Sequence, residues 1–306
     1  MSDISKLITE KTGYAELLNE LNEKLSGSEL NSLLLELFRK RAKKITPTEL
    51  LKHFGKNRFA APSSVDTIEF KELEIRCLKL AANKNFTPIT LSPLAPFGTC
   101  SAVGFVDQNN IVSALRGAEV VSDATNVFAL LIAKEFKKKK NNSVVKYTTT
   151  HRHVRSQALS NPGLTPHFGV FCMTTGGMDR GNFSFELEHL FEHIDIHLSL
   201  LSNEFEKDKL LVKILLKDDN EIFHQKLKDQ MKNDLVRIKI EKELNPGDYY
   251  KVVQFKFFLE HKGTEINLSD GGLVDWTQEL IQNKKHRLII SGAGTELIHK
   301  IKRNQL

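Results

Sequence analysis

The sequence predicts an α+β fold in which an antiparallel β-sheet is flanked by helices and preceded by a helical N-terminal extension. The first 60 residues carry apolar side chains at helical spacing, and from about residue 144 the spacing becomes that of strands. The predicted strands are separated by long connections without regular strand–helix alternation, which favours an antiparallel sheet. We therefore expect a helical extension over residues 1–60 and a core domain over residues 61–306.

Composition limits the class of protein. Of the 306 residues, 40% are hydrophobic and 27% are charged, which is typical of a globular protein and excludes collagen-like or wholly disordered chains. The N-terminus lacks the apolar segment of a signal peptide, and no apolar run reaches the roughly 18 residues of a membrane span. Three widely spaced cysteines argue against a disulfide framework, so we expect a cytoplasmic protein without a membrane association.

The N-terminal extension contains clear signals for helix ends. Ser26-Gly27-Ser28 ends one helix, and we expect Ser28 to cap the next. Thr46-Pro47-Thr48-Glu49 is a capping box that opens a short helix. Four basic residues between Lys40 and Lys44 indicate a solvated helix end that complements the helix dipole, and nucleic-acid contact is the weaker alternative.

In the core, Asp66 and Glu69 cap a helix that runs to about Asn83, and a strand-like segment ends at Pro93. Ser122 or Asp123 caps a further helix. The paired glycines Gly271-Gly272 are expected in a loop that precedes a helix near residues 275–282. The remaining periodicities predict one helix over 185–203 and strands over 144–157, 168–175, 210–216, 236–240, 249–260 and 287–291.

Five short segments occur in an order that one family shares. They are Ser122-Asp123-Ala124-Thr125, Val154-Arg155-Ser156-Gln157 followed by His167-Phe168, Asp248-Tyr249-Tyr250, Gly271-Gly272-Leu273-Val274-Asp275 and the glycine-rich run from Ser291 to Leu297. With these segments the chain, over roughly residues 66–306, resembles the catalytic core of class II aminoacyl-tRNA synthetases. The resemblance is greatest to the histidyl type and to its relative, the regulatory subunit of ATP phosphoribosyltransferase.

The resemblance implies a ligand site on one face of the sheet. It places Arg155 where the planar guanidinium of the family's arginine binds the ATP α-phosphate and a substrate carboxylate. It implies Glu296 as the second catalytic residue. The helix from Asp66 and the strand ending at Pro93 resemble the family's dimer element, which implies a homodimer. The implied substrate-binding residues are Asp123, Thr125, Gln157, His167, Asp248, Tyr249, Tyr250, Gly271, Gly272, Asp275, Gly292 and Gly294.

The chain departs from the family pattern at three functional positions. Gln157 replaces an acid, Asn245 stands where the family has a catalytic arginine, and Leu297 replaces the arginine that holds the nucleotide; Arg152 would take the role of Arg155 under a shifted register. Each lost charged contact costs on the order of 2–4 kcal/mol of transition-state stabilisation. We also expect no anticodon-binding domain, and hence no charging of tRNA.

These departures favour a synthetase paralogue that binds an amino acid or a nucleotide in a regulatory or accessory role. The first alternative is an ATP-dependent, adenylate-forming ligase that uses ATP with magnesium and a non-tRNA acceptor. The second alternative is a dimeric scaffold with a dead pocket.

A separate pattern has the spacing of a zinc site. His189 and His193 enclose Glu192 in an H-x-x-E-H arrangement, and His197 continues the same helix face. An apolar stripe, including Leu190 and Ile194, occupies this helix as well. We therefore interpret the segment as a packing helix and expect no metal.

Overall fold

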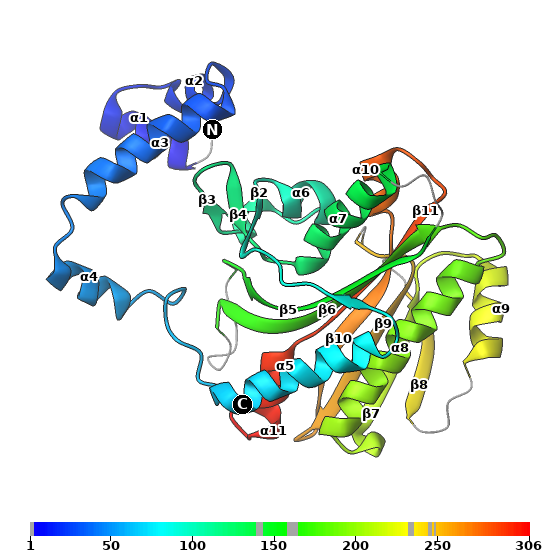
Figure 1. Cartoon of the computed structure of the whole chain (residues 1–306). Coiled ribbons are helices and arrows are strands. Elements are labelled where there is room, and N and C mark those ends of the chain that lie inside the picture. The colour runs from blue at the N-terminus through cyan, green and yellow to red at the C-terminus, as the bar shows by residue number, and fades with distance from the viewer. Residues whose placement is uncertain (1–2, 139–142, 158–164, 232–235, 244–246, 248) are drawn as a thin grey trace.

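An eight-stranded sheet organises the chain (Figure 1). The computed structural model describes residues 3–138, 143–157, 165–231, 236–243, 247 and 249–306. The helices are α1 Asp3–Thr12, α2 Leu17–Glu23, α3 Gly27–Ala42, α4 Pro47–Phe54, α5 Thr67–Ala82, α6 Thr99–Gly104, α7 Ala124–Lys138, α8 Ser184–Glu204, α9 Glu221–Gln230, α10 Trp276–Ile281 and α11 Thr295–Lys302. The strands are β1 Thr87–Pro88, β2 Leu94–Pro96, β3 Ser113–Ala114, β4 Ala118–Val120, β5 Val145–Val154, β6 His167–Met178, β7 Leu210–Leu216, β8 Arg237–Lys242, β9 Lys251–His261, β10 Thr264–Val274 and β11 His286–Ala293.

The large sheet has the order β1-β5-β6-β11-β10-β9-β7-β8, and it is mixed. Its inner strands are antiparallel, but β1 runs parallel to β5 at one edge and β8 runs parallel to β7 at the other. The prediction of an antiparallel sheet is therefore correct for the centre and wrong at the edges. At the β7–β8 edge the physical reason is the unpredicted helix α9, because a helical crossover returns the chain to the same end of the sheet and makes the next strand parallel.

Helices cover both faces of this sheet. α5, α8 and α11 pack on one face, where they enclose the largest apolar core. α7 and α10 pack on the other face and form two smaller apolar clusters with β6 and β11. A small sheet of order β2-β4-β3 lies beside α7 (Figure 1).

The N-terminal helices lie apart from the sheet (Figure 1), and α2, α3 and α4 contain no buried residue. The capping box at Thr46 and Glu49 is present, as predicted. The helix α3 is capped by Ser26 rather than by Ser28, since Ser26 forms a reciprocal capping box with Glu29. The division into an extension over 1–60 and a core over 61–306 remains a prediction. None of the helices in the described ranges is long and apolar enough to cross a bilayer.

The paired glycines lie inside a strand and not in a loop, which corrects the prediction. Gly271 and Gly272 belong to β10, between β9 and β11. A Cβ atom on Gly272 would lie 2.3 Å from the carbonyl oxygen of Val253, and one on Gly271 would lie 2.5 Å from the ring of Phe255. These glycines therefore serve the close approach of neighbouring chain segments rather than a turn.

Candidate functional site

A cavity of about 610 Å³ lies on the face of the sheet that α7 covers. Its lining includes residues at or near the start of α7, the end of β5 and the start of β9, and residues of the central strands β6, β10 and β11. The described predicted site residues that line it are Asp123, Thr125, Arg155, Gln157, Tyr249, Tyr250, Gly292 and Gly294. Residues from four of the five sequence segments thus meet at one place.

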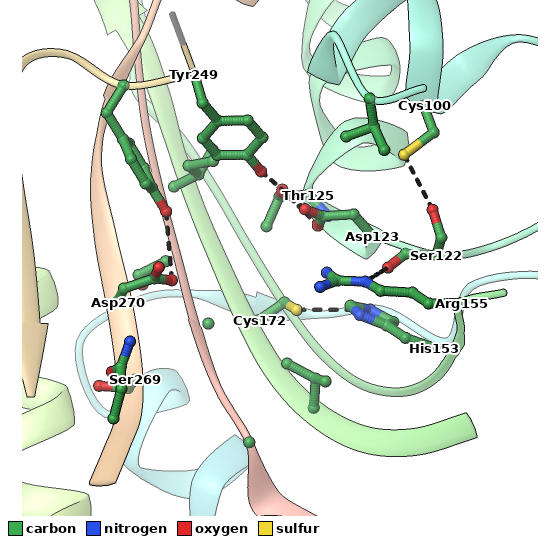
Figure 2. Close-up of a pocket in the computed structure, with 18 of the residues that line it drawn as sticks. Cys100, Ser122, Asp123, Thr125, His153, Arg155, Cys172, Tyr249, Ser269 and Asp270 are labelled. Atoms are coloured by element: carbon green, nitrogen blue, oxygen red, sulfur yellow. Dashed lines mark hydrogen bonds between the residues drawn. The ribbon is translucent and has the colours of Figure 1, made fainter. Parts of the chain in front are cut away.

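Asp123 is held in a fixed position by hydrogen bonds from its neighbours (Figure 2). One carboxylate oxygen accepts from the backbone nitrogen and the hydroxyl of Thr125, at 2.9 and 2.7 Å. The other oxygen accepts from the Tyr249 hydroxyl at 2.8 Å. Burial acts to raise the pKa of Asp123, but His153, Arg155 and the Thr125 hydrogen bonds lower it by more, so the carboxylate stays ionised.

Arg155 brings a cation to the same cavity. Its Nε donates to the carbonyl oxygen of Ser122 at 3.2 Å, and its guanidinium lies 5.5 Å from the centre of the Phe168 ring. Among the described residues its two terminal nitrogens have no hydrogen-bond partner, so they remain available to an anion. A planar guanidinium in this state is suited to bidentate contact with a carboxylate.

Arg155 and Arg152 lie in different surroundings. Arg152 does not line the cavity. It donates to Glu296 at 2.9 Å and contacts the ring of His167 at 2.6 Å, away from the cavity lining. Arg155 is therefore the arginine that faces the cavity, in the register that the sequence first suggested.

Several predicted site residues are placed outside this lining. Glu296 is 2% exposed and pairs with Arg152 and Lys300, while His167 contacts the carbonyl oxygen of Ala61. Asp275 precedes α10 and lies 3.6 Å from the amine of Lys251. The glycine pair is packed within the sheet, as described above. Asp248 and Asn245 lie outside the described residues.

Sequence reasoning missed two acids in the cavity, Glu243, which pairs with Lys217, and Asp270. Asp270 follows the bulged part of β10, next to Gly271, in a segment expected to be a loop. Its carboxylate oxygens lie 3.4 Å from the Tyr250 hydroxyl and 3.5 Å from the Gln254 amide nitrogen. In a strand, successive residues point to opposite faces of the sheet. Recognition of β10 as a strand would therefore have placed Asp270 and Gly272 on one face and Gly271 on the other.

Cys172 and His153 line the cavity beneath Arg155, and Cys100 lines it beyond Ser122 (Figure 2). Burial raises the pKa of Cys100 to about 11 and that of Cys172 well above its usual value. Burial also lowers the pKa of His153 to about 3, and its Nε2 accepts the backbone N–H of Ala124 at 3.0 Å. Because a thiol reacts as its thiolate, neither cysteine is a nucleophile near neutral pH.

The described part of the lining contains few cations. Its other described cation, Lys217, is already paired with Glu243, and the neighbouring Leu297 offers an apolar side chain. Arg155 is thus the one described lining cation that lacks a carboxylate within ion-pair distance. A single guanidinium of this kind can pair with one carboxylate or one phosphate group.

The histidines of the H-x-x-E-H pattern lie on α8, on the opposite face of the sheet. His193 contacts the hydroxyls of Thr175 and Ser291, at 2.9 and 2.7 Å, and Nδ1 of His189 lies 3.0 Å from Glu192. No group of three or more histidine, cysteine or acidic residues in the described ranges is arranged to hold a metal ion. In the structure this helix packs on the sheet, consistent with the interpretation above.

Several solved structures share this fold. Histidyl-tRNA synthetase from S. aureus matches with a TM-score of 0.59 at 14% identity, over 78% of this chain and 67% of that protein. A protein from Bacillus halodurans described as an ATP phosphoribosyltransferase regulatory subunit/histidyl-tRNA synthetase matches with a TM-score of 0.58 at 12% identity, over 80% and 82%. A histidine–tRNA ligase subunit from Alicyclobacillus acidocaldarius matches with a TM-score of 0.57 at 9% identity, over 80% and 96%.

No protein-family model and no curated protein matches the sequence of the chain. The fold is nevertheless that of the class II aminoacyl-tRNA synthetase catalytic core. The matching structures include histidyl-type proteins and a related regulatory subunit, which the sequence segments resemble. At these identities the likeness establishes the fold, and the role of the cavity follows from its own residues.

Proposed function

We propose that this chain is a class II synthetase paralogue that binds a free amino acid in the cavity, in a regulatory or accessory role, and does not charge tRNA. The observation that carries the proposal is the pairing of an available cation with an acid in one cavity. The two terminal nitrogens of Arg155 have no hydrogen-bond partner among the described residues. Asp123 lines the same cavity, and the charge of Arg155 helps to lower its pKa. A zwitterion requires both signs of charge, its carboxylate on the arginine and its ammonium on the aspartate.

Adenylate formation is the second candidate, and the described residues argue against it. Leu297 supplies no charge for a nucleotide, and Glu296 is engaged by Arg152, Lys300 and Ser63 instead of facing the cavity. An enzyme of this kind would stabilise a pentacovalent phosphate with several preorganised cations. We therefore expect no ATP–pyrophosphate exchange with any standard amino acid, and exchange at an ordinary turnover rate would establish the ligase function instead.

Amino-acid binding is tested by thermal shift and calorimetry with the twenty standard amino acids and ATP as separate probes. We expect at least one amino acid to stabilise the protein, by ~2.7 kcal/mol at a hundredfold excess over its Kd, because it binds only the folded state. Arg155→Ala should abolish this effect. A matched control is Arg180→Ala, whose guanidinium forms an exposed ion pair with Glu188 away from the cavity. Absence of any stabilisation by amino acids would leave the scaffold interpretation.

We also propose that the chain forms a homodimer through α5. Ile68 and Ile75 are 71% and 50% exposed, and their spacing of seven places them on one side of this helix. Two large apolar side chains on one exposed stripe favour a protein contact. We expect sedimentation equilibrium to give a dimer and the variant Ile68→Glu/Ile75→Glu to give a monomer. A monomeric wild-type protein at micromolar concentration would contradict the proposal.

A further inference from the structure

A second carboxylate, Asp270, faces the same cavity from β10 (Figure 2). In the sheet register Asp270 lies opposite Gly292 of β11 and Lys256 of β9. Gly292 has no side chain, and even a Cβ atom there would find no neighbour closer than 3.5 Å. The glycine therefore leaves room beside the carboxylate for about one Cβ atom in ordinary van der Waals contact, and both residues line the cavity in which the ligand would lie.

The carboxylate of Asp270 is poorly satisfied in comparison with that of Asp123. Its nearest donors, on Tyr250 and Gln254, are 3.4 and 3.5 Å away, whereas Asp123 accepts three hydrogen bonds between 2.7 and 2.9 Å. Among the described residues no lysine or arginine lies within ion-pair distance of Asp270. A buried carboxylate without close donors is costly unless a cation or a proton compensates it.

The pKa of Asp270 reflects this environment. Burial and the charge of Asp123 raise it, and the opposing effects of Lys256, Tyr250 and Arg155 are smaller. A cation placed next to the carboxylate would reverse this shift, because it favours the ionised form.

The charges of the lining point to the same conclusion. The described lining residues include three carboxylates, on Asp123, Glu243 and Asp270, and two cations, on Arg155 and Lys217. Lys217 and Glu243 neutralise one another as an ion pair. Arg155 then faces two acids, whereas the zwitterionic part of an amino acid would use only one of them. One carboxylate is left for a second positive group on the ligand.

We propose that Asp270, together with the side chains of Tyr250 and Gln254, binds the cationic side-chain group of the ligand, so that the cavity selects a basic amino acid. The class is an α-amino acid with an alkylammonium or guanidinium side chain, of which lysine, ornithine and arginine are examples. This inference rests on the proposed amino-acid site and specifies the class of side chain that the bound amino acid carries.

The experiment compares L-lysine with L-norleucine by calorimetry, since norleucine has a similar aliphatic chain without the amine. Wild-type protein should bind at least one of lysine, ornithine and arginine more tightly than norleucine by about tenfold or more, as expected for a hydrogen bond between two charged groups. Asp270→Asn should remove this preference and leave the affinity for norleucine within about threefold. Asp195→Asn is the matched control, because this aspartate of α8 pairs with Lys84 on the other face of the sheet.

The possible outcomes separate this inference from the function on which it rests. Binding of norleucine or glutamine as tightly as the basic amino acids would overturn the role of Asp270 while preserving an amino-acid site. Absence of binding by every amino acid would overturn both. The comparison of ligands on the wild-type protein needs no variant, so a failure of Asp270→Asn to fold would not leave the proposal undecided.

Discussion

Replacement of Glu296 by alanine is expected to lower the free energy of unfolding by about 3–5 kcal/mol, the usual cost of breaking a buried ion pair from one side. The carboxylate accepts from Arg152 at 2.9 Å, from the backbone of Gly169 at 3.2 Å and from Ser63 at 2.7 Å, and it lies 3.0 Å from the amine of Lys300. Glu296 and Lys300 are each 2% exposed. Chemical denaturation at neutral pH measures the effect.

The pKa of Glu296 supports a structural role. Burial alone would raise it, but hydrogen bonds from Ser63 and Lys300 and the charges of Arg152 and Lys300 lower it by more. The ionised form is therefore the one that the fold stabilises. The stabilisation is fully present above the pKa of a free glutamate and is lost as the pH falls through the lowered value.

Two further variants distinguish a structural from a catalytic Glu296. The double variant Glu296→Leu/Lys300→Met should recover much of the lost stability, since an apolar pair of similar volume often replaces a buried ion pair without loss. The control Glu188→Ala breaks an exposed pair with Arg180 and should cost less than about 1 kcal/mol. Unchanged stability of Glu296→Ala together with lost ligand binding would instead return Glu296 to the site.

The residues that define the cavity were predictable where local chemistry decides their position. Asp123 and Thr125 form a turn before a helix, and Arg155 directly follows a ten-residue strand. All three were predicted because their short segments resemble those of class II synthetases. Glu296 shows the limit of this reasoning. It lies between Gly294 and Leu297, which both line the cavity, yet the first turn of α11 directs its carboxylate toward Arg152. The direction in which a helical side chain points relative to a distant strand cannot be read from a short motif.

The edges of the sheet and the strand β10 were missed for a related reason. A glycine pair is most often a turn signal, and only the packing of Phe255 and Val253 against Gly271 and Gly272 shows why these positions lack side chains. Misassignment of β10 as a loop also concealed Asp270. The parallel pairing of β7 with β8 depends on the crossover through α9, whose ten residues carry a weak apolar pattern with Phe223 and Leu227 buried.

Buried histidines give the second large expected effect, a loss of stability in mild acid. His197 is fully buried among Phe171, Phe255 and Phe257, and neither ring nitrogen has a hydrogen-bond partner in the described structure. Burial lowers its pKa to about 3, and it lowers the pKa of His153 to about 3 as well. In the unfolded chain both rings titrate near 6.5, so between these values the unfolded state binds more protons than the folded state.

The sign of the effect follows from this difference in bound protons. Stability is complete above pH 6.5 and falls as the pH decreases toward the folded pKa, by about 1.4 kcal/mol per pH unit for each such histidine. His197→Leu should therefore reduce the slope of unfolding free energy against pH between 6 and 4 by about 1.4 kcal/mol per unit. It should also stabilise the protein at pH 7 by about 1–3 kcal/mol, because it removes a buried polar ring without partners.

Urea denaturation at several pH values measures both quantities. Leu190→Met is the matched control, since it changes a buried side chain of the same helix without altering the number of titratable groups. The control should shift stability by less than about 1.5 kcal/mol and leave the slope unchanged. An unaltered slope in His197→Leu would mean that the His197 ring of the wild-type protein is protonated in the folded state as well. Its aromatic surroundings would then have to hold a charge that no described residue compensates.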